Sequence, residues 1–219
     1  MKMKRVKHPL DKHQWIAYPS SKQYIVWHGT GHRTKFTPYS GLAGSPVHVI
    51  NNWNNDGEKS GAPYIVDRNG TVFEVFPDTD WAHHLHINSS NGHYDKHSVA
   101  IEIANELGLT KKDGLLYAFN STYHQNAYLG KAWDKDYRGY NHWAELNIAQ
   151  VDSLIELTLE LCKKFKITPR FYNSDEFDPA VWDKATIFRH LNCRKDKTDL
   201  PLNDWVIDKI RDAGIELVT

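Results

Sequence analysis

Short apolar runs separated by turn residues predict the first strands of the fold. Residues 24–27 form one such run, which indicates a buried strand, and a Gly-Thr-Gly segment breaks it soon afterwards. Residues 64–67 and 71–76 flank an Asn-Gly pair, a strong signal for a tight hairpin turn. Residues 98–104 are a third apolar run, with one carboxylate inside it. The pattern predicts a buried strand, a hairpin and a further strand, in that order.

Apolar residues with helical spacing predict four helices. The longest lies within residues 144–165, where one face collects Val151, Leu154, Ile155, Leu159 and Cys162. A short helix fits residues 46–53. Two more fit residues 179–189, which begin at an Asp-Pro pair, and residues 202–212, which Gly214 closes.

Residues 105–143 separate the third strand from the long helix and show no strong periodicity. They are polar and rich in Gly, Tyr and Asn, so we predict a long loop insert here. Loops of this length in compact domains are usually functional or mobile. Because strands and helices are mixed in order elsewhere, we expect an α/β sandwich around one sheet, with residues 1–219 forming a single domain.

Composition excludes several classes of protein. The chain has 219 residues, of which 40% are hydrophobic, and its 27 basic and 27 acidic residues balance. This balance excludes the strong basic field of a nucleic-acid binder. No stretch approaches the ~20 apolar residues of a membrane span. The positive N-terminus lacks a following apolar segment, so we expect synthesis in the cytoplasm without a signal peptide.

Three separated residues could together hold a metal ion. His28 ends the first apolar run, His190 follows the third predicted helix, and Asp199 lies nine residues further on. Two imidazoles and one carboxylate suit zinc and leave a fourth position open. The chain has 13 histidines, and a given histidine is more often a surface or core residue, so the three residues alone do not decide the matter.

The order of the motifs resembles that of the type-2 N-acetylmuramoyl-L-alanine amidases, the superfamily that also holds phage amidase lysozymes and peptidoglycan recognition proteins. The resemblance spans about residues 22–212. Each segment alone is weak, but five follow in the family's order: Tyr-Ile-Val-Trp-His-Gly-Thr at 24–30, the hairpin at 63–75, Trp-Ala-His-His at 81–84, Ser-Val-Ala-Ile-Glu at 98–102, and His190 with Lys-Thr-Asp at 197–199.

The resemblance implies a fold and a metal site. The fold would be a central mixed β-sheet flanked by helices, with a core at about residues 22–212 and the insert at about 105–143. His28, His190 and Asp199 would hold Zn²⁺, which would bind the attacking water and polarise the scissile carbonyl.

The resemblance also implies roles for three further residues. Glu102 matches the family's catalytic carboxylate, which suits proton transfer from water to the leaving amine. Lys197 matches a basic residue that can stabilise an oxyanion. His84 would line the substrate pocket, whereas we interpret His83 and His86 as polar loop residues.

The implied activity is hydrolysis of the amide between muramic acid and L-alanine in peptidoglycan. Peptidoglycan or muropeptides would be the partners, with no nucleic acid and no membrane span, and we expect a monomer. We expect a phage or prophage endolysin, which would act on the bacterial cell wall. Two alternatives stay open: a cytosolic muropeptide-recycling amidase, and a non-catalytic peptidoglycan-binding module. The three intact ligand residues favour an enzyme over the binding module.

Overall fold

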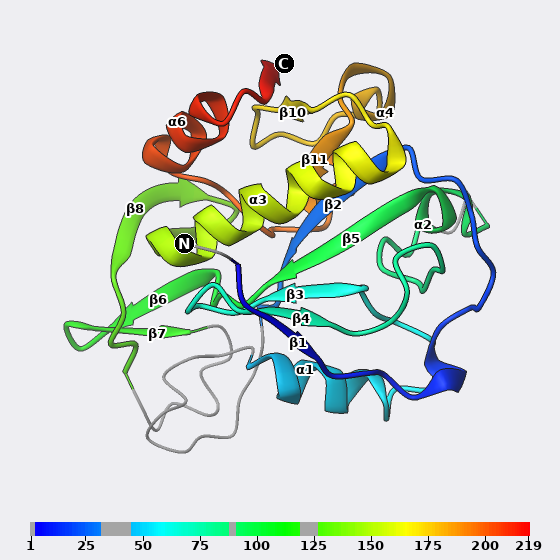
Figure 1. Cartoon of the computed structure of the whole chain (residues 1–219). Coiled ribbons are helices and arrows are strands. Elements are labelled where there is room, and N and C mark those ends of the chain that lie inside the picture. Colours follow the sequence, from blue (N-terminus) through cyan, green and yellow to red (C-terminus); the bar gives the residue numbers. More distant parts are fainter. Residues whose placement is uncertain (1–2, 32–44, 88–90, 119–126) are drawn as a thin grey trace.

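The main body of the chain is an eight-stranded sheet with helices on both faces (Figure 1). The computed structural model describes residues 3–31, 45–87, 91–118 and 127–219. Within this part, all neighbouring strands of the sheet run parallel except the β3–β4 hairpin. In spatial order the strands are β1 (Arg5–Lys7), β4 (Val72–Glu74), β3 (Tyr64–Val66), β5 (Ser98–Ile103), β2 (Tyr24–Gly29), β11 (Ile187–Arg189), β10 (Arg170–Tyr172) and β12 (Glu216–Val218). The predicted mixed sheet, its buried strand and its hairpin are confirmed.

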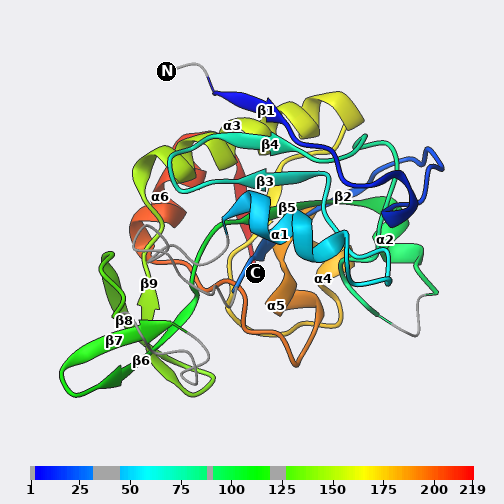
Figure 2. The same ribbon diagram turned by 90° about the horizontal axis from the view of Figure 1, so that it is seen from below.

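Helices cover the two faces of this sheet unequally. On one face α3 (Ile148–Phe165) and α6 (Asp204–Asp212) cover the largest core cluster. On the other face lie α1 (Pro46–Trp53), α4 (Val181–Lys184) and α5 (His190–Cys193), over two smaller clusters. Figure 2 shows the sheet between these two layers. The short α2 (His93–His97) precedes β5, and a 3-10 helix covers Lys12–Gln14.

The long helix begins later than its apolar pattern suggests. Residues 140–144 belong to a strand, and α3 starts after Asn147, whose side chain accepts a hydrogen bond from the backbone N–H of Gln150 at 3.0 Å. This side-chain cap satisfies one of the free N–H groups at the start of a helix. The helices predicted at 46–53 and 202–212 are confirmed as α1 and α6, the latter starting at Asp204.

The helix predicted at residues 179–189 is wrong in its second half. Only Val181–Lys184 is helical, and Ile187–Arg189 is strand β11, between β2 and β10. Ile187 packs in the cluster under α3, whereas Phe188 packs in a cluster on the opposite face. A strand buried on both faces has a continuous apolar run, which periodicity alone cannot distinguish from a buried helix.

The loop predicted at residues 105–143 is wrong for much of its described part, because four strands between residues 108 and 144 form a second sheet (Figure 2). Residues 119–126 of the predicted insert lie outside the described residues. The sheet is antiparallel, and only Leu109, Tyr137 and Trp143 of its strands are buried large apolar residues, while many other positions face solvent. Strands that bury so few residues lack the strict alternation that signals a strand. In spatial order they are β7 (Leu115–Ala118), β6 (Gly108–Lys112), β9 (Tyr140–Ala144) and β8 (Ala132–Tyr137).

Among the described helices, none combines the length and the hydrophobicity that a membrane span requires.

The turn of the β3–β4 hairpin packs tightly against the start of α3, which gives a test of the fold. Gly70 has a φ of +80°, and a Cβ added there would lie 2.5 Å from the carbonyl oxygen of Ala149. Gly214 has the same φ of +80° but nothing within 4 Å of the equivalent position. Both alanine variants incur the left-handed backbone cost of about 1–2 kcal/mol, but only Gly70→Ala adds a clash.

We expect Gly70→Ala to lower the free energy of unfolding by about 1–3 kcal/mol more than Gly214→Ala does, the usual cost of overpacking. Chemical denaturation of the two variants and the parent protein measures this difference. Equal losses in the two variants would show that the hairpin turn is not pressed against α3.

Candidate active site

Two neighbouring parallel strands bring His28 and Glu102 to the same face of the main sheet. β2 and β5 pair so that His28 lies opposite Glu102. Trp27 and Ile101, one residue earlier in each strand, pack in the core under α3. Because successive side chains of a strand point to opposite faces, His28 and Glu102 both point away from α3. The core on one face therefore fixes the positions of the polar groups on the other.

His190 and Asp199 reach His28 from the next strand and from the loop that follows it. His190 comes directly after β11, in which Arg189 pairs with Trp27 of β2. The backbone N–H of Leu191 donates to the carbonyl oxygen of Asp199 at 3.0 Å, which holds the returning loop beside α5. Parallel pairing and one loop contact therefore place both side chains next to His28.

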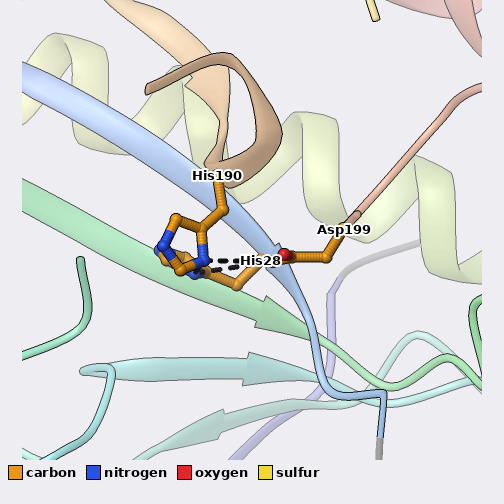
Figure 3. Close-up of side chains that lie close together, drawn as sticks. All are labelled: His28, His190 and Asp199. Carbon is orange, nitrogen blue, oxygen red and sulfur yellow. Dashed lines mark hydrogen bonds and ion pairs between the residues drawn. The ribbon is translucent and has the colours of Figure 1, made fainter. Parts of the chain in front are cut away.

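Three side-chain atoms converge at this point (Figure 3). The Nδ1 atoms of His28 and His190 lie 3.0 Å apart. The Oδ2 atom of Asp199 lies 3.3 Å from His190 Nδ1 and 3.8 Å from His28 Nδ1. It also accepts from the backbone N–H of Gly29 at 3.3 Å. All three side chains are buried, and within the described residues they are the only group of three or more His, Cys, Asp or Glu side chains with this convergence.

The three atoms fit a tetrahedral zinc ion. Nitrogen and oxygen ligands lie about 2.0–2.2 Å from zinc, so tetrahedral ligand atoms lie roughly 3.3–3.5 Å from one another. The observed separations of 3.0, 3.3 and 3.8 Å bracket that value. Burial, with His190 and His84 nearby, holds the pKa of His28 well below its usual range. His28 is therefore neutral, which is the form that binds metals.

Glu102 lies next to these residues with an unpaired oxygen. Its Oε2 atom is buried and has no hydrogen-bond partner among the described residues. Burial, reinforced by the charge of Asp199 and partly offset by Lys197, raises the pKa of Glu102 to about 8. In the metal-free protein this carboxyl group is therefore protonated at neutral pH. A carboxyl group in this state can donate a proton as a general acid.

All six residues singled out from the sequence line one cavity of about 510 Å³. Trp53 of α1 lines it as well, and so do Leu107, Gly108 and Tyr140 from the second sheet and the turn before it. The cavity is large enough for part of a substrate of several rings or residues. Its walls thus come from both sheets.

A sequence model of N-acetylmuramoyl-L-alanine amidases matches residues 18–201.

The chain belongs to this amidase family.

The family assignment accounts for the fold and supports an amidase that acts on peptidoglycan. Three solved structures share the fold. The N-acetylmuramyl-L-alanine amidase AmiD from E. coli is 17% identical, with a TM-score of 0.52, and the match covers 91% of this chain and 60% of that one. A mutant endolysin from Bacillus subtilis is 11% identical, with a TM-score of 0.52 and 97% of each chain covered, and the PlyG catalytic domain is 10% identical, with a TM-score of 0.50 and coverages of 98% and 97%. No curated protein matches the sequence.

His84 lies deeper in this amidase than a residue that only lines the pocket. Both of its ring nitrogens are engaged: Nδ1 lies 3.0 Å from His28 Nε2, and Nε2 lies 2.8 Å from Ser98 Oγ. Its neighbours His83 and His86 line the cavity without joining the three converging atoms. The predicted contact of His84 with substrate therefore stays a prediction, whereas its two ring nitrogens both contact protein groups.

Two residues around the candidate site had no signal in the sequence. Asp95 is buried and accepts hydrogen bonds from the backbone N–H groups of His84 and Leu85, both at 2.8 Å. Arg138, in the turn between β8 and β9, donates from Nη1 to the carbonyl oxygen of Lys197. Arg138 lies 59 residues before Lys197, and Asp95 lies 11 residues after His84; neither belongs to a recognisable motif. Only the three-dimensional structure could reveal them.

The environment of Glu102 predicts how stability depends on pH. In the metal-free protein the folded state keeps the Glu102 proton up to about pH 8, whereas the unfolded chain loses it near the ordinary value of 4.5. The folded state therefore binds more protons between these values, so raising the pH through this window favours unfolding. Relative to Glu102→Gln, the free energy of unfolding of the parent should fall between about pH 4.5 and 8 and then level off.

Chemical denaturation of both metal-free proteins across this pH window measures the difference. The Gln variant is the matched control, because it keeps the shape of the side chain and loses only the titrating proton. A difference that stays constant with pH would mean that Glu102 is already charged at neutral pH.

Proposed function

We propose that this chain is a zinc-dependent N-acetylmuramoyl-L-alanine amidase that hydrolyses the amide between the lactyl group of muramic acid and L-alanine in peptidoglycan. One observation carries the proposal: a buried two-histidine, one-carboxylate cluster shares a cavity with an unpaired carboxyl group, in a chain of this family. The cluster suits a metal, and the carboxyl group suits proton transfer.

The ligand residues would be His28, His190 and Asp199, through the three atoms that converge. When bound, zinc supplies Lewis-acid chemistry, which can activate a water molecule and polarise a carbonyl oxygen. The three side chains would hold the ion in the wall of the cavity that all of them line. This arrangement is typical of catalytic rather than structural zinc sites.

Glu102 would move the proton that the reaction requires. Its Oε2 atom is the unpaired group in the cavity wall, beside the predicted ligands. As a carboxylate it can take a proton from the attacking water, and as a carboxylic acid it can give that proton to the leaving amine of alanine. A pKa near 8 in the metal-free protein lies close to the pH at which both roles are balanced.

Lys197 would stabilise the negative charge that develops on the carbonyl oxygen. It lines the cavity on the loop that also carries Asp199. Its backbone carbonyl accepts from Arg138, so the second sheet holds this part of the loop. A cation held in place before the reaction stabilises an oxyanion without reorganisation at the moment of reaction.

The cavity walls suit a ligand that combines a sugar with a peptide. Trp53 offers an aromatic ring on one side, and Tyr140 of the second sheet offers another. The E. coli AmiD structure was solved with anhydro-N-acetylmuramic acid-L-Ala-D-γ-Glu-L-Lys, a ligand of this kind. We therefore propose a muropeptide or its polymeric form as the substrate.

Two biological settings fit this activity. The resemblance to an endolysin from Bacillus subtilis supports a phage or prophage endolysin, which is the setting we favour. A cytosolic recycling amidase would use soluble fragments in place of intact wall. The third possibility, a binding module without activity, is disfavoured because the ligand residues and Glu102 are all present in one cavity.

Product analysis tests the proposed bond. We expect digestion of purified sacculi and of soluble muropeptides to release stem peptides with new alanine amino termini and to create no reducing sugar ends. Mass spectrometry of the products and a reducing-end assay measure both. Cleavage of sacculi favours the endolysin, whereas cleavage of soluble fragments alone favours the recycling enzyme.

The control for this digestion is Glu102→Gln, which should lose about 10²–10⁴-fold in turnover, the usual contribution of a positioned proton-transfer group. It should still bind zinc, because Glu102 is not one of the three converging ligands. New reducing ends in place of alanine termini would identify a glycosidase and refute the proposal.

A further inference from the structure

A chain of hydrogen bonds links the carbonyl group of Tyr94 to His28 through Ser98 and His84. The carbonyl group fixes which atom donates in each of these hydrogen bonds. Ser98 Oγ lies 2.6 Å from the carbonyl oxygen of Tyr94. A carbonyl oxygen can only accept, so the Ser98 hydroxyl group donates its single hydrogen there. Toward His84 Nε2, at 2.8 Å, the Ser98 oxygen must therefore accept, and His84 Nε2 carries a hydrogen.

The position of the hydrogen on His84 in turn determines which ring nitrogen of His28 carries a hydrogen. A neutral imidazole with its hydrogen on Nε2 has a lone pair on Nδ1. His84 Nδ1 lies 3.0 Å from His28 Nε2, so His28 Nε2 must supply the hydrogen between them. The lone pair of His28 then lies on Nδ1, the atom 3.0 Å from His190 Nδ1. The hydrogen-bond chain thus leaves a metal-binding lone pair at the point where the ligand atoms converge.

Further hydrogen bonds hold the backbone of the loop that carries His84. Asp95 Oδ1 accepts from the backbone N–H groups of His84 and Leu85, both at 2.8 Å, which fixes the loop that carries His84. Asp95 and Tyr94 both belong to the short helix α2, which runs directly into Ser98 at the start of β5. One segment therefore holds both the backbone and the ring of His84.

The second histidine of the cluster has no such support. His190 Nε2 is buried and has no partner in the described part of the chain. Histidines that bind metals almost always donate their second ring N–H to a partner, which fixes the ring and its tautomer. Within the described residues, His28 alone of the two has this support.

We propose that His84, itself oriented by Ser98 and the carbonyl group of Tyr94, is a positioning residue that fixes the tautomer of His28 with its lone pair on Nδ1 and thereby strengthens zinc binding. The inference rests on the proposed zinc site. In this proposal His84 orients a metal ligand and does not bind the substrate.

The first experiment reads the tautomers directly in the metal-free protein. Long-range ¹H–¹⁵N correlation spectra of ¹⁵N-histidine protein distinguish protonated from unprotonated ring nitrogens. We expect His28 and His84 both to carry the hydrogen on Nε2, with assignments from His28→Gln and His84→Gln. A hydrogen on Nδ1 of His28 would overturn the proposal, whether or not the protein is active.

The second experiment measures zinc affinity by competition with a chromophoric chelator. His84→Ala should weaken zinc binding about 10–100-fold, the usual effect of losing an outer hydrogen-bond partner. His84→Gln should recover most of the affinity, because its amide oxygen can accept from His28 Nε2. Ser98→Ala should weaken binding as well, because it removes the group that orients His84.

His83→Ala is the matched control: His83 is the neighbouring residue and lines the same cavity, but no contact joins its ring to His28 among the described residues. Its zinc affinity should equal that of the parent. Parent-like zinc affinity in His84→Ala, with a raised KM for muropeptide, would overturn the proposal and make His84 a substrate contact. A parent protein that binds no zinc at all would instead refute the proposed function.

Discussion

The parallel register of three central strands is the constraint on which the site depends. β2 pairs with β5 so that His28 lies beside Glu102, and with β11 so that Trp27 lies beside Arg189, one residue before His190. A slip of one residue would send each side chain to the opposite face. Trp27 prevents the slip, because its ring packs in the core under α3 and its Nε1 donates to Thr158 Oγ1 of that helix at 3.1 Å. Apolar packing on one face therefore sets the geometry of polar groups on the other.

Lys197 and Asp199 lie on a loop and not on a strand. Hydrogen bonds from Arg189 and Arg138 hold this loop in place. Arg189, buried behind the site, donates from Nη1 to the carbonyl oxygen of Leu200 at 3.1 Å, directly after Asp199. Arg138 of the second sheet donates to the carbonyl oxygen of Lys197. The second sheet thus forms part of the cavity wall and also holds the loop that completes the site.

The sequence predicts the parts of this protein whose pattern is local. Apolar runs bounded by turns predict the strand before His28, the Asn-Gly hairpin and the strand around Glu102. The resemblance in motif order assigns the six site residues to one site. The second sheet escapes prediction because its strands bury few residues, and β11 because it is apolar on both faces. The contacts of His84 with His28 and Ser98 escape it too, since hydrogen bonds between residues far apart in the chain leave no periodic signal.

Zinc titration of the metal-free protein measures whether turnover depends on one zinc ion held by His28, His190 and Asp199. Protein stripped by chelation and verified by elemental analysis would receive zinc in increments while alanine amino termini released from muropeptide are counted. We expect no turnover without metal, a rise that ends at one zinc ion per chain, and loss of both metal and activity in His28→Ala. Full turnover by the verified metal-free protein would contradict this expectation.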